Sequence, residues 1–322
     1  MTPDSGIFVA GHRGLVGSGI VRCLQRAGYS NLVLRDRNEL DLTRQDAVEA
    51  FFDEAKPEFV FLAAAKVGGI LANDTRPAEF LRDNLAIQTN IIDSAYRHRT
   101  KKLLFLGSSC IYPKLAAQPI AEDCLLTGPL EPTNEWYAIA KIAGLKMCQA
   151  YRRQYGFDAI CAMPTNLYGP GDNFDLRSAH VLPALVRKFH EAKASGAGEV
   201  EIWGSGKPRR EFLHVDDLAD ACLFLMQSYS SEQPLNVGWG KDVSIAELAD
   251  RVAKTVGYNG ALRFNPSMPD GTPRKLLDVT RLRALGWMAK IPLDSGITGT
   301  YSWFLQNESQ WAKTLPAAEK TA

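Results

Sequence analysis

The chain has 322 residues and a formal net charge of +1 at pH 7, and 46% of its residues are hydrophobic while 23% are charged. These values are typical of a soluble globular protein and exclude a general attraction to nucleic acid or to an anionic membrane surface. No signal-like segment opens the sequence and no apolar run reaches ~18 residues, so we expect a cytoplasmic protein. The six cysteines form no CxxC pair and no metal-ligand pattern with the five histidines, which predicts reduced thiols and no bound metal.

The first predicted strand, residues 7–10, runs directly into a glycine-rich segment and then into a helical pattern that continues through Gln25. The glycine-rich segment is Gly11-His12-Arg13-Gly14-Leu15-Val16-Gly17. Glycines at this place let the backbone turn tightly and approach a pyrophosphate, whose charge is favoured by the helix N-terminus. The spacing is GxxGxxG and not the GxGxxG of most dehydrogenases, but its position between strand and helix predicts a dinucleotide-binding loop.

A second apolar run, residues 31–34, ends in Arg35-Asp36-Arg37, about 20 residues beyond the last glycine, where dinucleotide folds contact the adenosine ribose. An acid here would accept a hydrogen bond from the 2′-hydroxyl, whereas an arginine would pair with a 2′-phosphate. Arg37 together with Arg13 favours NADP, since two guanidinium groups suit a phosphate dianion. The alternative is that these are solvated loop charges. Asp41-Leu42 would then hold the adenine edge.

The same alternation continues along the chain. Further buried strands are predicted at residues 59–65, 101–106 and 158–163, and helices at residues 46–54, 77–98 and 134–155. Strands that alternate with helices predict an α/β fold with a Rossmann-type, doubly wound parallel sheet, whose ligands lie at the carboxyl ends of the strands. The loops that follow these strands, residues 66–69, 107–110 and 164–170, are rich in small or polar residues.

Tyr137 and Lys141 lie four residues apart in the predicted helix 134–155 and therefore share one face. A phenol normally ionises near pH ~10, and a cation beside it favours the phenolate, which lowers its pKa toward neutrality. The pair is a candidate proton donor to a carbonyl. The alternative is a surface tyrosine beside a solvated lysine.

After Pro170 the sequence contains more proline, glycine and aromatic residues, which indicates a substrate lobe. This part contains a predicted helix at residues 181–194, a turn at 203–206, and a strand at 234–238 that returns to the sheet. We expect an NADP-binding domain at residues 1–170 with return segments near 213–242, a mainly substrate-binding lobe at 171–315, and a frayed tail at 316–322.

Taken together, these features resemble the extended short-chain dehydrogenase/reductase family in its branch that acts on nucleotide sugars. The residues that carry the resemblance are Gly11, Gly14 and Gly17, Ala63-Ala64-Ala65, the serine loop before Ile111-Tyr112, Tyr137 with Lys141, and residues 166–170 and 210–217. A closer resemblance, to the GDP-4-keto-6-deoxy-D-mannose 3,5-epimerase/4-reductases, is carried by GHRGLVGS, LAAAKVGGI, FLGSSCIYPK, LEPTNEWYAIAKIAG, MPTNLYGP, WGSG, REFLHVDD and PDGTPRKLLD. The chain departs from that branch in the short stretch 229–234, at Trp136 and at Asp175.

The resemblance implies five catalytic residues. Tyr137 would be the general acid at C4, Lys141 would lower its pKa and bind the nicotinamide ribose, and Ser108 would hydrogen-bond the C4 oxygen. Cys110 would be the base and His180 the acid of C3/C5 epimerisation. From composition alone, Ser108 is a serine in a tight turn, Cys110 a small buried residue and His180 a helix-start residue.

Cys110 decides the reaction type. Related dehydratases carry Asp-Glu where this chain has Ser109 and Cys110, so dehydration is disfavoured. A thiolate can instead remove an acidic proton next to the 4-keto group.

The resemblance also implies binding residues. The GDP-sugar substrate would contact Lys188, Trp203, Arg210 and Asp270, although relatives more often have arginine in place of Lys188. NADP(H) would contact Gly11, His12, Arg13, Gly14, Leu15, Val16, Gly17, Arg37, Asn38, Asp41, Leu42, Ala64, Leu106, Gly107, Lys141, Pro164, Thr165, Asn166, Leu167 and His180. A homodimer would form through a bundle of two helices from each subunit, residues 77–98 and the Tyr137 helix.

Two other functions remain open from the sequence. One is a C4 reductase or C4 epimerase of another GDP-4-keto sugar, including 6-deoxyheptoses, without the C3/C5 step. The other is a non-catalytic NADP-binding sensor or scaffold, which the presence of Ser108, Tyr137 and Lys141 disfavours.

Overall fold

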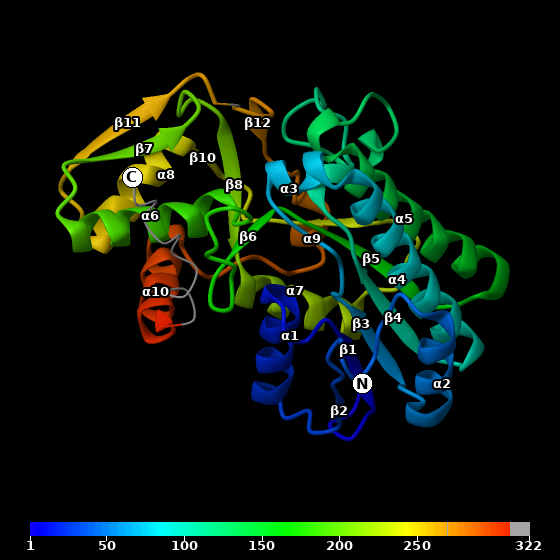
Figure 1. Ribbon diagram of the computed structural model, residues 1–322. Coiled ribbons are helices and arrows are strands. Elements are labelled where there is room, and N and C mark those ends of the chain that lie inside the picture. Colours follow the sequence, from blue (N-terminus) through cyan, green and yellow to red (C-terminus); the bar gives the residue numbers. More distant parts are fainter. Residues whose placement is uncertain (269, 310–322) are drawn as a thin grey trace, which may run out of the picture.

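The computed structural model describes residues 1–268 and 270–309. Figure 1 shows a large sheet covered by helices beside a smaller lobe that contains α6, α8 and α10. The strands of the large sheet are β1 (Ile7–Ala10), β2 (Leu32–Val33), β3 (Phe59–Leu62), β4 (Lys102–Leu106), β5 (Ala159–Pro164) and β9 (Leu235–Val237). The tail predicted at residues 316–322 lies outside the described residues.

The six strands are parallel and lie in the order β2-β1-β3-β4-β5-β9. From β1 the chain therefore runs to β2 on one side of that strand. It then crosses to β3, which lies on the other side of β1. Ligands of such sheets bind where the strand order reverses, at the carboxyl end of β1. The doubly wound parallel sheet expected from the sequence is confirmed, and the predicted return strand is β9.

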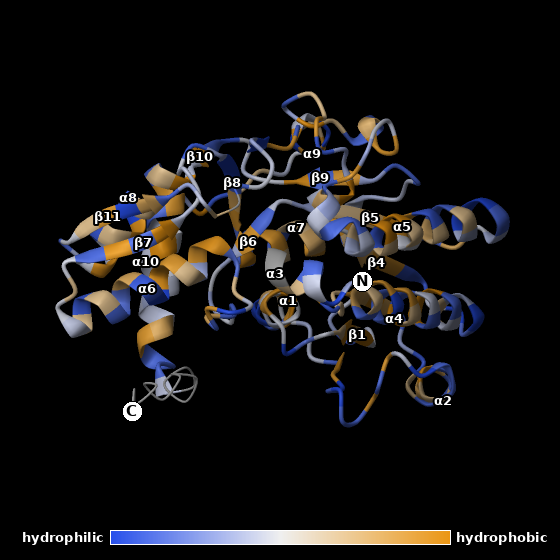
Figure 2. Ribbon diagram, turned by 45° about the horizontal axis from the view of Figure 1, so that its top comes forward, coloured by the Kyte–Doolittle hydropathy of each residue, from blue (hydrophilic) through white to orange (hydrophobic). Residues whose placement is uncertain are grey.

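Helices cover both faces of the sheet. One face carries α1 (Leu15–Arg26) and α7 (Val215–Ser228), and the other carries α2 (Gln45–Ala55), α4 (Pro77–Arg97) and α5 (Glu135–Tyr155). Alternate residues of β1 face the two layers, because Ile7 and Val9 pack against α1 and α7 while Phe8 and Ala10 pack against α2. Every residue of this strand is buried, which explains its continuous apolar run. Figure 2 shows the hydrophobic residues in the strands and along the inner stripes of the helices.

The lobe has a core of its own. Its helices are α6 (Val181–Ser195), α8 (Ile245–Val256) and α10 (Leu293–Gln306), and its strands are β6 (Asn166–Tyr168), β7 (Glu199–Trp203), β8 (Arg209–His214), β10 (Asp242–Ser244), β11 (Ala261–Asn265) and β12 (Arg274–Lys275). Strand β8 pairs with β6, β10 and β12, so it joins the lobe to the loop after β5. Ser244 and Glu247 form a reciprocal capping box that begins α8.

Short elements complete the chain: α3 (Ile70–Thr75), α9 (Thr280–Ala284), and the 3₁₀ turns η1 (Ser109–Ile111), η2 (Glu122–Cys124) and η3 (Pro132–Asn134). The structure adds to the sequence prediction in the lobe, where the short strands β6, β7, β8, β10, β11 and β12 were not predicted. The strand predicted at residues 59–65 ends three residues early, because the chain leaves β3 to pass the glycine loop. None of the described helices is both long enough and apolar enough to cross a membrane.

Candidate active site

The glycine loop lies at the carboxyl end of β1 and leads into α1. Gly11 has a φ of +83°, and a Cβ added there would lie 2.8 Å from the Cα of Ala64, so the two loops touch through their backbones. A Cβ on Gly17 would lie 2.1 Å from the carbonyl oxygen of Gly11. Gly14 differs from both, because an added Cβ would meet only an ordinary contact at 3.5 Å. Packing within the protein explains Gly11 and Gly17 but gives no reason for Gly14.

The N-terminus of α1 suits an anion. Gly14 is its N-cap residue and supplies no side-chain hydrogen bond, and the first turn contains no acidic residue. Free backbone N–H groups and the helix dipole both favour negative charge at such a place. The residues present therefore fit the pyrophosphate of a dinucleotide, with Gly14 leaving room for close approach.

The charges after β2 lie beside this loop. Asp36 accepts hydrogen bonds from the backbone N–H groups of Asn38 and Glu39, at 2.8 and 3.1 Å, and pairs with Arg13 at 2.8 Å. These hydrogen bonds and the Arg13 guanidinium hold the pKa of the Asp36 carboxyl below its usual range. Asp36, the acid that could accept from a 2′-hydroxyl, is thus already engaged. Arg37 is exposed and has no hydrogen bond or ion pair within the described chain.

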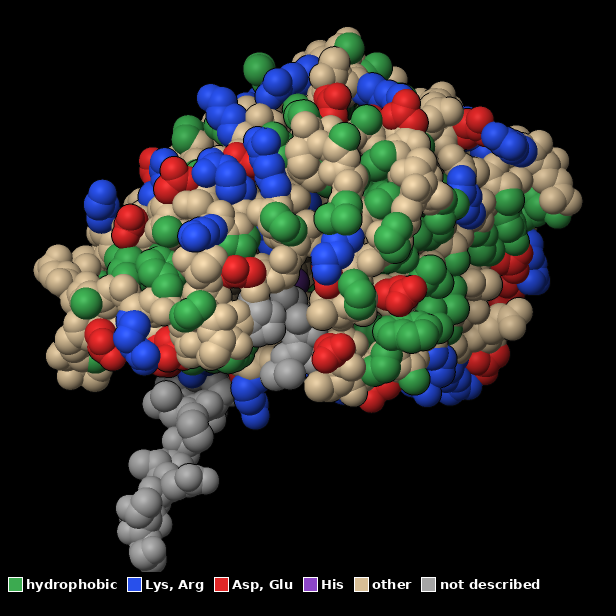
Figure 3. Space-filling view, turned by 90° about the horizontal axis from the view of Figure 1, so that it is seen from above, with side chains coloured by type: hydrophobic (Ala, Val, Ile, Leu, Met, Phe, Trp, Pro, Cys, Tyr) green, Lys and Arg blue, Asp and Glu red, His purple; other side chains and the backbone are tan. Residues whose placement is uncertain are grey.

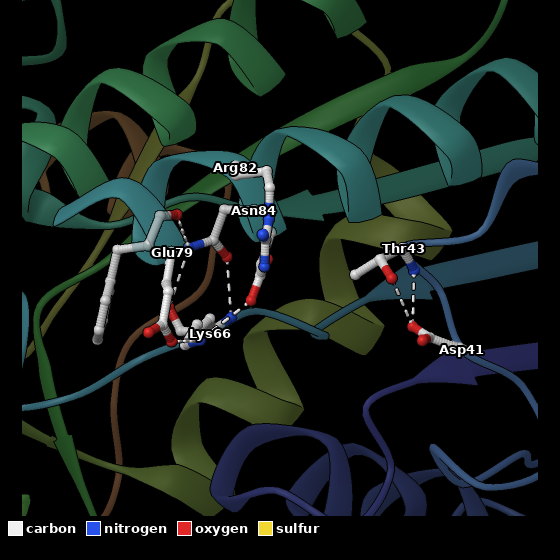
Figure 4. A network of polar contacts seen from close by, with 8 residues as sticks. Asp41, Thr43, Lys66, Glu79, Arg82 and Asn84 are labelled. Atoms are coloured by element: carbon white, nitrogen blue, oxygen red, sulfur yellow. Dashed lines mark hydrogen bonds and ion pairs between the residues drawn. The ribbon is translucent and has the colours of Figure 1, made fainter. Parts of the chain in front are cut away.

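The loops after β2 and β3 are fixed by polar contacts (Figure 4). Asp41 accepts from both the backbone N–H and the hydroxyl of Thr43, at 3.0 and 2.8 Å. Lys66 exchanges two backbone hydrogen bonds with the amide of Asn84, at 2.9 and 3.0 Å, and its ammonium pairs with Glu79 and Asp83 of α4. The contacts of Lys66 fix the loop after β3, which contains Ala64, to α4.

Tyr137, Lys141 and Ser108 meet at the carboxyl end of β4. Tyr137 and Lys141 lie one turn apart on α5, with the Lys141 Nζ atom 5.9 Å from the centre of the Tyr137 ring. The Ser108 hydroxyl accepts from the backbone N–H of Cys110 at 3.2 Å, and its proximity to the Tyr137 phenol acts to lower the pKa of that phenol. Lys141 is only 4% exposed and donates to the carbonyl oxygen of Leu106 at 2.9 Å.

The prediction that Lys141 lowers the pKa of Tyr137 is wrong for the protein chain itself. Burial raises the pKa of Tyr137, and the nearby Cys110 adds to this, while only the Ser108 hydroxyl lowers it. Burial likewise lowers the pKa of Lys141 to about 8. The helical spacing brings the two groups together as predicted. However, the ammonium points to the Leu106 carbonyl, and desolvation outweighs its effect on the phenol.

Cys110 lies in η1, two residues after Ser108, and its side chain is half-buried. Its Sγ atom accepts from the Asn134 side-chain nitrogen at 3.4 Å and from the Lys275 Nζ atom at 3.6 Å. It also lines a small hollow together with Ser109, Tyr112, Pro113, Lys114, Ile120, Glu131, Thr272, Arg274 and Lys275.

His180 is the N-cap residue of α6. Its side chain is exposed, and desolvation by the protein around the ring lowers its pKa. The preceding residues lie against the loop after β3, since the Gly69 N–H donates to the Ser178 carbonyl at 3.1 Å. This contact places His180 at the same edge of the sheet as Cys110 and Tyr137. Within the described chain, its side chain makes no hydrogen bond with either residue.

The four predicted substrate residues form a connected series. The Lys188 Nζ atom lies 5.4 Å from the centre of the Trp203 ring, which is half exposed. Asp270 accepts from the backbone N–H and from the hydroxyl of Ser205, both at 2.7 Å, and its backbone carbonyl accepts from Arg210 at 3.3 Å. Burial lowers the pKa of Lys188 and of Arg210, and the charges of Asp270 and Cys110 act on the Arg210 guanidinium in the opposite direction.

Cations thus extend from Trp203 toward Cys110. Viewed from above, Lys and Arg side chains are interspersed with Asp and Glu side chains across this face (Figure 3).

The remaining predicted cofactor residues lie at the same edge. Leu106 and Gly107 end β4, and a Cβ on Gly107 would lie 2.3 Å from the sulfur of Met163. The other predicted positions lie at or just after the carboxyl ends of β1, β2 and β5, including the start of α1 and strand β6: His12, Leu15, Val16, Asn38, Leu42, Pro164, Thr165, Asn166 and Leu167. Thr165 and Asn166 both donate to the carbonyl of Glu211, at 3.3 and 2.8 Å, which ties this loop to β8.

Two of the departures from the resembling branch, Trp136 and Asp175, are at least partly exposed. Trp136 is 45% exposed on α5, and Asp175 pairs with Arg177 at 3.0 Å. Asn134 and Lys275 are neighbours of Cys110 that were not predicted from the sequence. Both lie inside the runs that carry the resemblance, LEPTNEWYAIAKIAG and PDGTPRKLLD, but neither run indicates that it folds back onto the sulfur.

The sheet and the site together indicate the class of enzyme. A proton donor held beside the dinucleotide-binding edge of a parallel sheet is the arrangement of a Rossmann-fold oxidoreductase that reduces carbonyl groups. A model of the NAD dependent epimerase/dehydratase family matches residues 7–238, which is more than half of the sequence. The chain therefore belongs to the NAD dependent epimerase/dehydratase family, and the membership expected from the sequence is confirmed.

Individual relatives extend this likeness over nearly the whole chain. GDP-L-fucose synthase 1 of Arabidopsis thaliana is 64% identical over 94% of this chain and 93% of the relative. GDP-L-fucose synthase of Escherichia coli (strain K12) is 56% identical over 95% of this chain and 98% of the relative. A solved GDP-mannoheptose C4 reductase from Campylobacter jejuni with NADP bound is 42% identical, with a TM-score of 0.87 over 95% of this chain and 99% of that one.

Proposed function

We propose that this chain is an NADPH-dependent enzyme that converts GDP-4-keto-6-deoxy-D-mannose to GDP-L-fucose, by epimerisation at C3 and C5 followed by reduction at C4. One observation carries this proposal. Cys110 is hydrogen-bonded through its backbone to the same Ser108 hydroxyl that contacts Tyr137. A candidate base for carbon acids and a candidate proton donor therefore share one loop, as a two-step reaction in one site requires. Identities of 64% and 56% to named GDP-L-fucose synthases support it.

Reduction at C4 uses the groups on α5 and β4. When bound, NADPH supplies the hydride for C4. Tyr137 gives its phenolic proton to the C4 oxygen, and the Ser108 hydroxyl hydrogen-bonds that oxygen as negative charge develops on it. Lys141 is held at the floor of this site by the Leu106 carbonyl, where it would bind the nicotinamide ribose.

Epimerisation uses the acidity that the 4-keto group gives to the neighbouring C–H bonds. The Cys110 thiolate takes the proton from C3 or C5, which forms an enolate and a neutral thiol. His180 gives a proton to the opposite face of the same carbon, which inverts that centre. Exchange of both groups with solvent restores them for the second centre.

The substrate would lie along the series from Trp203 to Cys110. Lys188 and Arg210 would neutralise the diphosphate, Trp203 would pack against the guanine or the sugar, and Asp270 would accept from ribose or base. Lys188 offers a point charge and lacks the two-pronged geometry of arginine, which makes Arg210 the more directional contact.

The cofactor preference rests on charge. Arg13 is held by Asp36 and Arg37 is exposed and unpaired in the described chain, so the 2′-phosphate of NADP would be bound by these arginines. A solved relative with NADP bound supports this preference. For assembly, we propose a homodimer in which α4 and α5 of two subunits form a four-helix bundle.

A second candidate function is favoured by the 42% identity to a GDP-mannoheptose C4 reductase. In that case the same Tyr137 and Ser108 would reduce C4 of another GDP-4-keto sugar, without inversion at C3 or C5.

Proton NMR in heavy water separates the two functions. With GDP-4-keto-6-deoxy-D-mannose, the proposed enzyme incorporates deuterium at both C3 and C5, also without NADPH. Reduction without any label at these carbons would instead support the C4 reductase. The Cys110→Ser variant is expected to lose the label while it still reduces an already epimerised substrate, and equal loss of both steps would contradict the role of Cys110 as base.

A further inference from the structure

The sulfur of Cys110 has two nitrogen donors beside it. The Asn134 side-chain nitrogen lies 3.4 Å from Sγ, and the Lys275 Nζ atom lies 3.6 Å from it on a different part of the chain. The backbone N–H of the same cysteine is held by the Ser108 hydroxyl at 3.2 Å. The sulfur is therefore fixed in position by its backbone and faces donors from two other segments.

Both donors are held firmly by their own elements. Asn134 ends η3 directly before α5, the helix that carries Tyr137. Lys275 lies in β12, where it is in register with Arg210 of β8. The next two residues are fixed as well, because the Leu276 N–H donates to Gln118 at 2.8 Å and the Leu277 N–H donates to the buried carboxylate of Glu211 at 3.0 Å.

The other charged and titratable groups around the sulfur are engaged elsewhere or lie farther away. Lys114 pairs with Glu131 at 2.9 Å, and Arg274 pairs with Asp242 at 2.5 Å. Arg210 acts on Cys110 through its charge but gives its hydrogen bonds to backbone carbonyls. Tyr137 also faces the sulfur and is a neutral phenol. Among the described residues, Lys275 is the cation that hydrogen-bonds Sγ.

We propose that Lys275 and Asn134 hold the Cys110 sulfur as a thiolate, so that Lys275 is a positioning residue for the epimerisation steps. This inference rests on the proposed role of Cys110 as the base. An ammonium and an amide N–H both favour a negatively charged sulfur over a neutral thiol. In the reaction the proton passes from the sugar carbon to the sulfur, and Lys275 keeps its own protons throughout.

Alkylation of Cys110 by iodoacetamide tests this directly, because the thiolate is the reacting form. The measurement uses the full chain with Cys124→Ala, since Cys124 is half-buried while the remaining four cysteines are buried. The rate at Cys110 is followed against pH by mass spectrometry. In Lys275→Met we expect the profile to move to higher pH, because the ammonium that favours a negatively charged sulfur is lost.

Two matched variants complete the test. Lys275→Arg keeps the charge and should restore most of the profile, whereas Lys114→Met removes a cation of the same hollow that is paired with Glu131 and should leave the profile unchanged. An unchanged midpoint in Lys275→Met overturns the proposal. Lys275→Gln replaces Lys275→Met if the latter does not fold, with the same expected shift.

Deuterium exchange then links the sulfur to the reaction. Lys275→Met should lower exchange at C3 and C5 by about tenfold or more, while reduction of an already epimerised substrate changes less than twofold. The role of Cys110 as base and the role of Lys275 beside it can be contradicted separately. If Cys110→Ser retains exchange, the proposed base is wrong, yet the alkylation profile still decides whether Lys275 acts on the sulfur.

Discussion

The two halves of the site are built in different ways. The glycine loop is a local structure, in which residues 11–17 follow one another between β1 and α1 and pack against Ala64 mainly through backbone atoms. The substrate side consists of contacts between distant segments, such as Ser205 with Asp270 and Cys110 with Lys275. A local loop is preserved by its own sequence, whereas the substrate side depends on how the lobe packs onto the sheet.

This difference implies that the two halves can be impaired independently. Changes after β1 and β2 should alter cofactor affinity with little effect on the GDP-sugar. Changes in the lobe should alter the affinity for the GDP-sugar with little effect on cofactor affinity. Tyr137 and Lys141 lie where the halves meet and should affect the reaction most.

Tyr137→Phe tests that junction and should have the largest effect. Loss of the proton donor should reduce NADPH oxidation by about 10²- to 10⁴-fold, because positioned acids contribute factors of this size. Affinities for NADPH and for GDP should stay within about twofold of the wild type, as should deuterium exchange at C3 and C5. Tyr155→Phe is the matched control, since Tyr155 lies on the same helix and is 47% exposed. Retention of more than half of the rate in Tyr137→Phe would exclude this residue as the donor.

Lys141 predicts a dependence of stability on pH. Its pKa in the folded protein is lowered to about 8, below its ordinary value of 10.5, so folding favours the neutral amine. The cost of the buried ammonium is fully present below pH 8 and disappears as the pH rises from 8 to 10.5. The shift corresponds to about 3 kcal/mol of unfolding free energy.

Urea unfolding of the wild type and of Lys141→Met at pH 8 and pH 10.5 measures this effect. The wild type should gain stability relative to the variant over that range. Lys146→Met, an exposed lysine on the same helix, is the control and should show no such difference. Parallel pH curves for wild type and Lys141→Met would mean that the ammonium is not destabilised by burial.

The fold and the local half of the site could be predicted from the sequence for a physical reason. Fully buried parallel strands require continuous apolar runs, and a turn against a neighbouring backbone requires glycine, so both leave a direct signal in the sequence. The spacing of Tyr137 and Lys141 follows equally from the helical repeat. The orientation of the Lys141 ammonium toward the Leu106 carbonyl does not follow from that repeat, and the effect of Lys141 on Tyr137 was predicted wrongly.

The lobe left weaker signals. Its strands are short and pair with partners far along the chain, as β12 does with β8 across more than sixty residues, so alternation within each strand says little about its neighbours. The contact of Lys275 with Cys110 depends on that pairing. The contact could not be predicted, because the sequence does not reveal the register of these two strands.

Arg37→Ala tests the local half. Removal of the unpaired guanidinium should weaken NADPH binding by about 10- to 100-fold, since a hydrogen bond to a charged group contributes about 1.5–3 kcal/mol. NADH, which lacks the 2′-phosphate, should be affected less than threefold. Arg35→Ala is the control, because that exposed arginine donates to the neighbouring Leu34 carbonyl and lies 5.9 Å from the centre of the Phe51 ring. Equal weakening of both cofactors, measured by fluorescence titration, would contradict phosphate recognition by Arg37.

Asp270→Asn tests the lobe and should have the smallest effect. The carboxylate holds the Ser205 backbone and hydroxyl, and a Cβ on Gly204 would lie 2.3 Å from its Oδ1 atom, so the turn after Trp203 is fitted closely to this side chain. In the variant the amide oxygen can still accept from the Ser205 N–H, and the amide nitrogen can donate to the Ser205 hydroxyl, so the two charge-assisted hydrogen bonds become weaker neutral ones.

Calorimetry should therefore find GDP binding about 2- to 10-fold weaker in Asp270→Asn, with the NADPH affinity unchanged. Asp250→Asn, an exposed carboxylate on α8 of the same lobe, should leave both affinities at the wild-type value. If Asp270→Asn weakened NADPH as much as GDP, the two halves would not be separable, because the lobe would then transmit its changes through β8 to the loop after β5 and so to the cofactor edge.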